Sequence, residues 1–161
     1  LVWYTALTRV VHDAYSKRGK KGYLFTVGDE RVPPNLTAED VKRAFGETPQ
    51  SVPTNAQMLD ALAQQWEVFH IIVEQGSHMR WDREGVIRSW TDLMGQRAIL
   101  LADVDKLSEV MISTIEVIEG RNVDDVVKSW SGDTSLVVAK AVSGLNSLAT
   151  RPGDSGAVTR F

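Results

Sequence analysis

The residues of this sequence best suited to chemistry are carboxylates and a histidine that follow runs of apolar residues. Asp29 and Glu30 come after the apolar run Tyr23–Val27 and a glycine, and Asp103 follows a later run. Carboxylates brought together repel one another unless solvent, a partner or a cation compensates their charge. Hard divalent cations such as Mg²⁺ prefer oxygen ligands of this kind. The candidate rim residues are Asp29, Glu30, Glu74, Ser77, His78 and Asp103.

The same residues support two further interpretations. They could form an acidic, solvated rim made of helix-capping residues, with no ligand at all. Alternatively, Asp29, Glu74 and His78 could serve a small α/β enzyme in acid–base or metal-assisted chemistry. The spacing of these residues does not separate the interpretations.

The elements that must position these residues are three apolar runs that read as buried strands. The runs are Tyr23–Val27, Val68–Val73 and Ala98–Ala102. Continuous runs of this length are typical of strands buried on both faces of a parallel sheet. In such sheets, ligands bind at the carboxyl ends of the strands. The sequence therefore predicts that the acidic residues after the three strands lie along one edge of the sheet.

Helical patterns alternate with these strands. Leu7, Val10, Val11 and Ala14 predict one helix that ends by Gly19. Strands alternating with helices imply right-handed crossovers and a parallel sheet. The expected fold class is α/β, a Rossmann-like three-layer sandwich with a C-terminal helical extension. Further helix signals are the capping boxes at Thr37 and Thr54, the apolar residues Val86 and Trp90, the stripe Leu107, Val110, Met111, Ile115 and Ile118, and a last helix from Leu136 to Leu148 with Val138, Ala141, Val142, Leu145 and Leu148 facing inward.

Composition excludes several classes of site. The chain has no cysteine, which excludes disulfides, thiolate metal sites and cysteine nucleophiles. A net charge of −3 argues against nucleic acid as the main partner. No apolar run approaches the roughly 20 residues needed to cross a bilayer. The chain begins at Leu1, already in helical pattern, which suggests a missing upstream segment. We expect a cytoplasmic protein.

Several segments together resemble a known family. The segment Lys17–Glu30 resembles the fourth strand of von Willebrand factor A-type (vWA) domains, in a bacterial variant. Trp66–Ile71 resembles the fifth strand, and Trp90–Leu101 resembles the helix and strand that follow it. Asp103–Ile118 resembles the closing helix. The resemblance implies a partial vWA fold, the carboxyl-terminal half of the domain.

The resemblance also implies a function. Members of the family are non-catalytic protein-interaction modules that bind Mg²⁺ or Mn²⁺ at a metal-ion-dependent adhesion site, where a partner's carboxylate completes the coordination. It implies that Asp29 belongs to this site. The family's central Asp-x-Ser-x-Ser loop does not occur in this chain, so metal binding requires that the upstream half supply it. Without that loop, the expected alternative is a structural assembly domain with a decayed site.

The resemblance covers residues 1–120, and the sequence pattern beyond them sets the other expected domains. Residues 1–120 form the C-terminal half of the vWA-like domain, residues 121–150 a helical extension and residues 151–161 a flexible tail. The family's fourth strand pairs with its first, which leaves Tyr23–Val27 at an edge. We expect the upstream half or another chain to cover this edge, because an open apolar edge invites association.

Overall fold

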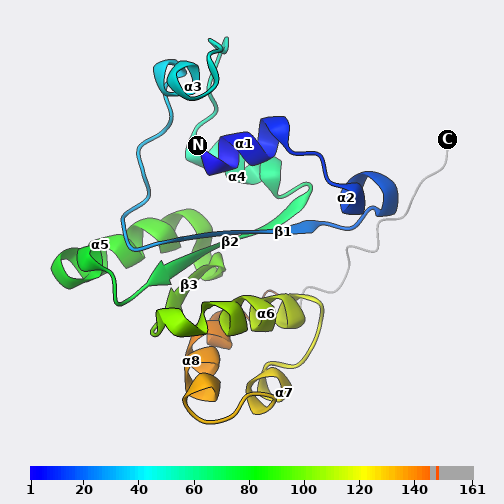
Figure 1. The fold of residues 1–161 in the computed structure, drawn as a ribbon, viewed down its shortest axis with the longest axis vertical. Coiled ribbons are helices and arrows are strands. Elements are labelled where there is room, and N and C mark those ends of the chain that lie inside the picture. Colours follow the sequence, from blue (N-terminus) through cyan, green and yellow to red (C-terminus); the bar gives the residue numbers. More distant parts are fainter. Residues whose placement is uncertain (146–147, 149–161) are drawn as a thin grey trace. The chain divides into compact units, whose positions relative to one another are not determined.

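The computed structural model describes residues 1–145 and 148 and has an α/β fold with a three-stranded parallel sheet and flanking helices (Figure 1). The strands β1 (Gly22–Gly28), β2 (Trp66–Val73) and β3 (Ala98–Leu101) follow one another in the order β1-β2-β3. The expected fold class is thus confirmed. The predicted flexible tail lies outside the described residues.

The chain divides into two compact units, Leu1–Ala98 and Ile99–Phe161. This division falls at the start of β3, whereas the expected domains place a boundary after residue 120. In the described part of the chain, no helix is both long and apolar enough to span a membrane.

The first unit is organised by the parallel pair β1 and β2, which runs in register from Gly22 opposite Trp66 to Gly28 opposite Ile72. The side chains of β2 from Val68 to Ile72 are buried, whereas those of β1 are mostly half-buried. Because side chains alternate between the faces of a strand, Phe69 and His70 lie on opposite faces. In this pair, β2 is therefore the central, buried strand and β1 is an end strand of the sheet.

Five helices belong to this unit. The two predicted capping boxes are confirmed: Thr37 pairs with Asp40, and Thr54 pairs with Gln57, each through side-chain and backbone bonds in both directions. The helices α4 and α5 pack on β2, and α1 packs on α4. A single 3₁₀ turn, η1 (Gly95–Arg97), leads into β3. The helices are α1 (Val2–Arg9), α2 (Asp13–Arg18), α3 (Ala38–Phe45), α4 (Asn55–Leu62) and α5 (Ser77–Met94).

The prediction of one helix before β1 is wrong, because the chain forms two. Val10 and Val11 lie between α1 and α2 and are exposed. His12 ends the break by capping α2, since its Nδ1 accepts a hydrogen bond from the backbone N–H of Tyr15. The β-branched pair disfavours a continuous helix, and the local cap stabilises the break.

The second unit is a small helical cluster around α6 (Leu107–Ile118), α7 (Val123–Lys128) and α8 (Asp133–Val142), with the 3₁₀ turns η2 (Val104–Lys106) and η3 (Ser143–Leu145). The predicted inward face of α6 is wrong in part. Its buried stripe is Val110, Ser113, Thr114 and Val117, so that Met111, Ile115 and Ile118 are only half-buried.

The two polar residues of the buried stripe on α6 are both hydrogen-bonded. The hydroxyl of Ser113 accepts a hydrogen bond from the indole N–H of Trp130 at 2.8 Å, and the hydroxyl of Thr114 donates to the carbonyl of Val110. On α8, Leu136, the first residue of the predicted helix, is exposed. It lies off the i, i+3, i+4, i+7 stripe that Val138, Ala141, Val142 and Leu145 bury.

Candidate functional site

Asp29, the residue directly after β1, is fixed to the start of α5. Its Oδ2 accepts a hydrogen bond from the backbone N–H of His78 at 3.0 Å. This bond, more than any other influence, lowers the pKa of Asp29 below its ordinary value. Gly76, the N-cap residue of α5, has no side chain that could take this role. Asp29 therefore caps α5 from a distant part of the sequence.

The close approach of Asp29 requires a glycine at position 76. A Cβ atom built on Gly76 would lie 2.2 Å from both the Cβ and the Oδ2 of Asp29. The backbone of Gly76 has ordinary angles, with φ −66° and ψ 160°. The glycine is thus needed for space and not for its conformational freedom.

His78 stands between two carboxylates at this rim. Its Nδ1 lies 3.4 Å from Oδ2 of Asp29, and its Nε2 lies 3.6 Å from Oε1 of Glu30. The side chains of His78 and Glu30 are 55% and 73% exposed. A protonated His78 would interact favourably with both carboxylates, although exposed pairs contribute little to stability.

The other predicted rim residues take different roles. Glu74 is largely buried and accepts a hydrogen bond from the guanidinium of Arg83 at 2.7 Å. Ser77 is the first residue of α5 and is exposed. Asp103 belongs to the second unit, where its Oδ1 accepts a hydrogen bond from the backbone N–H of Asp105 and so caps η2.

These placements do not complete a metal site. Within residues 1–145 and 148, no group of three or more histidine, aspartate or glutamate side chains could hold a metal ion. Asp29 alone offers a carboxylate at the position that the resemblance implies. A bound metal ion would need further ligands from elsewhere.

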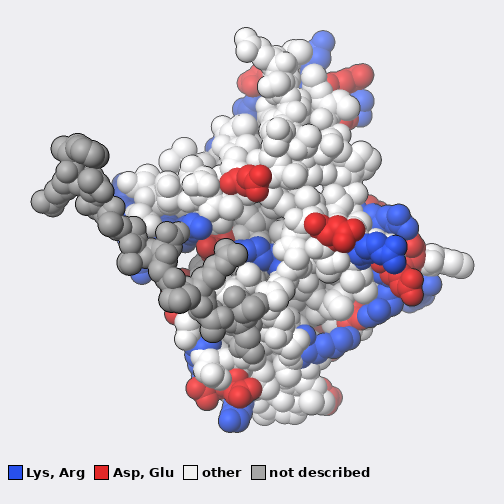
Figure 2. Space-filling model, turned by 180° about the vertical axis from the view of Figure 1, so that it is seen from behind, with Lys and Arg blue, Asp and Glu red and all other residues white. Residues whose placement is uncertain are grey.

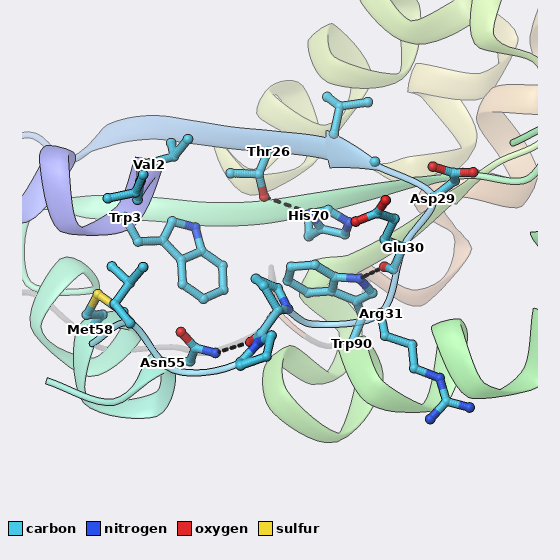
Figure 3. Close-up of a pocket in the computed structure, with 16 residues that line it drawn as sticks. Val2, Trp3, Thr26, Asp29, Glu30, Arg31, Asn55, Met58, His70 and Trp90 are labelled. Carbon is cyan, nitrogen blue, oxygen red and sulfur yellow. Dashed lines mark hydrogen bonds between the residues drawn. The ribbon is translucent and has the colours of Figure 1, made fainter. Parts of the chain in front are cut away.

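A cavity of about 410 Å³ opens beside the end of β1 (Figure 3). Its walls are mainly apolar and come from α1, α4, α5 and the loop that follows β1. Trp3 and Trp90 meet edge to face in its wall, with ring centroids 5.9 Å apart. The other labelled lining residues in Figure 3 include Val2, Thr26, Arg31, Asn55 and Met58.

His70 is a buried titratable group that lines this cavity. Its ring stacks on Trp90 with centroids 3.4 Å apart, and its Nδ1 lies 2.8 Å from the hydroxyl oxygen of Thr26. The indole N–H of Trp90 in turn donates to the carbonyl of Glu30 at 2.7 Å. Burial lowers the pKa of His70 to about 4. The histidine is therefore neutral at physiological pH and belongs to the core.

Sequence reasoning missed the second attachment between the loop after β1 and α5. Arg31 in this loop pairs with Asp82, where α5 is kinked by non-helical angles of φ −146° and ψ 43°. The guanidinium lies against Gly85, where an added Cβ would come within 2.1 Å of an Arg31 nitrogen. The available signal was Gly85, directly before the predicted helical residues Val86 and Trp90, since a glycine beside a helical pattern can mark a close approach.

Comparisons with protein-family models, with curated proteins and with solved structures found no match.

Proposed function

We propose that this chain is part of a non-catalytic, vWA-type protein-interaction module, in which Asp29 contributes to a Mg²⁺ or Mn²⁺ site. The observation that carries the proposal is the position of Asp29. It follows a parallel strand directly, and the backbone N–H of His78 orients its carboxylate. Ligand sites in parallel α/β sheets lie at this end of the strands.

In this proposal the chain supplies one metal ligand and part of the surrounding surface. The N–H of His78 keeps Asp29 ionised by lowering its pKa, as a metal ligand requires. Glu30 and His78 remain exposed beside it for contact with a partner. The bound cation would attract the partner's carboxylate. The Asp-x-Ser-x-Ser loop that holds the cation would precede Leu1.

A second part of the proposal concerns β1. It stands at the end of the strand order, and Val27 is 46% exposed. Cover for this edge by a preceding segment or another chain would satisfy its backbone groups and bury its apolar side chains. The expected position of Tyr23–Val27 at an edge agrees with the strand order of the described sheet.

The enzyme interpretation has less support from the same geometry. It uses Asp29, Glu74 and His78 in acid–base or metal-assisted chemistry. Asp29 is bound to the start of α5, and Glu74 is bound to Arg83. The bond to Asp29 lowers its pKa and so makes it a weaker base, and the Glu74 carboxylate is engaged by the guanidinium of Arg83.

Calorimetric titration with Mg²⁺ and Mn²⁺ tests the proposal, on the natural protein that contains this chain. D29N keeps an oxygen that can cap α5 but removes the charge. We expect D29N to weaken metal binding about tenfold or more, equivalent to ~1.4 kcal/mol. D40N is the matched control, because Asp40 also caps a helix but lies in the capping box of α3.

Two results would contradict the proposal. Equal metal affinity of the wild-type and D29N proteins would exclude Asp29 from the site. Absence of an Asp-x-Ser-x-Ser loop from an otherwise complete domain would favour the structural assembly domain instead.

A further inference from the structure

Trp81 in α5 is the most exposed large hydrophobic side chain of the described residues, at 89%. Tryptophan side chains are usually largely buried, so exposure of this degree is informative. Tryptophan and arginine are also the residues that most often dominate binding at protein interfaces. Arg80, the residue before Trp81, is exposed as well.

The turn Ser77–Trp81, called the Trp81 turn below, is held firmly at its beginning. The backbone N–H of His78 is bound to Asp29, and the backbone of Gly76 packs directly on that aspartate. Met79 anchors the turn from beneath, since its side chain is only 4% exposed. Trp81 is therefore displayed on a supported piece of backbone.

The same turn is held at its end. Asp82, the residue after Trp81, pairs with Arg31 from the loop after β1. The guanidinium of Arg31 packs against Gly85 in the next turn of the helix. An exposed aromatic residue on a fixed backbone loses little conformational freedom on binding, which favours affinity.

Ion pairs compensate most of the positive charge near the Trp81 turn. Arg31 pairs with Asp82, and Arg83 pairs with Glu74. Among the residues that the structure describes, Arg80 has no carboxylate within ion-pair distance. Figure 2 shows the same tendency on one face of the molecule, where basic and acidic side chains lie in mixed groups. Arg80 is thus a cation free to meet an acidic group from outside.

We propose that the Trp81 turn docks an acidic segment of a partner protein. An apolar side chain of the segment packs on the indole of Trp81, and a neighbouring carboxylate pairs with the guanidinium of Arg80. The inference rests on the proposed function in taking the partner to be a protein. It does not depend on the metal ion, because neither residue is a proposed ligand.

Selection from a displayed library of random peptides tests this docking, with the natural protein that contains this chain as target and EDTA present. We expect the selected peptides to share an acidic residue beside an apolar one. Fluorescence anisotropy with a selected peptide then compares three variants. W81A and R80E should each weaken binding about tenfold or more. E84K is the matched control, since Glu84 is exposed and lies after the kink at Asp82. Reversing the charge of this side chain should not weaken the binding of an acidic peptide.

Several outcomes would overturn the inference. One is that no peptide is selected, and another is that W81A binds the selected peptides as tightly as the wild-type chain does. A third is that the selected peptides are basic and that E84K weakens their binding. Binding of the chain to vesicles of phosphatidylserine and phosphatidylcholine, lost in W81A, would assign the turn to a membrane surface instead. Because EDTA removes divalent ions, failure here is separate from failure of the metal titration.

Discussion

Replacing Gly76 with alanine should break the connection between the end of β1 and α5. The new Cβ would lie 2.2 Å from the Cβ and Oδ2 of Asp29, well inside van der Waals contact. The Cβ of Asp29 is fixed to its backbone, so a side-chain rotation cannot remove the clash. The chain must separate at this point, and the hydrogen bond from the His78 N–H to Asp29 must lengthen.

The expected cost has two parts. Overpacking a tight site costs about 1–3 kcal/mol. Loss of a helix cap costs about 1 kcal/mol. Because φ at Gly76 is −66°, an angle that alanine adopts readily, backbone strain adds nothing to this cost. We therefore expect G76A to lower the free energy of unfolding by about 2–4 kcal/mol.

Urea unfolding followed by circular dichroism measures this change, and amide hydrogen exchange at His78 locates it. G28A is the matched control, because a Cβ on Gly28 would meet its nearest neighbour, Cε1 of His70, at an ordinary 3.7 Å. We expect G28A to stay within about 0.5 kcal/mol of the wild-type chain. If G76A were as stable as G28A and kept the His78 amide protected, the reasoning about this contact would be refuted.

Three further predictions concern the same region. Burial lowers the pKa of His70 from 6.5 to about 4, so the unfolded chain takes up a proton at higher pH than the folded chain does. The free energy of unfolding should therefore fall by up to about 3 kcal/mol as the pH drops from 6.5 to 4. H70Q should flatten this part of the pH–stability curve, and an unchanged slope would contradict the assignment. W90F should cost about 1–3 kcal/mol in urea unfolding, since the carbonyl of Glu30 loses the indole N–H as its donor; a neutral result would show that water replaces the indole without penalty. D29A should destabilise the chain by about 1 kcal/mol and D29N by less, because asparagine keeps a capping oxygen; equal losses in the same assay would mean that charge, not the cap, matters.

Local chemistry explains which parts of the fold the sequence predicts. The runs at β1, β2 and β3 are short and almost entirely apolar, with Thr26 and His70 as exceptions, so their length and composition identify them. The caps at Thr37 and Thr54 join residues three positions apart, and their signal lies entirely within a few residues. The failures at Val10 and on α6 arose where several apolar residues fitted more than one face of a helix.

The site depends on contacts between residues far apart in the chain, which periodicity does not reveal. Asp29 and His78 could be placed near one another, because both follow strands of one parallel sheet. The hydrogen bond between them could not be foreseen, since the sequence does not show that Gly76 lets the two segments touch. The wall formed by Trp3 and Trp90 was hidden for the same reason.

The two attachments of the loop after β1 to α5 have a thermodynamic consequence. Asp29 holds the start of the Trp81 turn, and Arg31 holds its end at Asp82. A ligand that draws the Asp29 carboxylate away from His78 must therefore alter the free energy of this turn. By linkage, a ligand on the turn changes affinity at Asp29 by the same factor. The short loop from Asp29 to Arg31 couples the rim to the Trp81 turn, so that a ligand bound at one changes the affinity of the other for its own ligand.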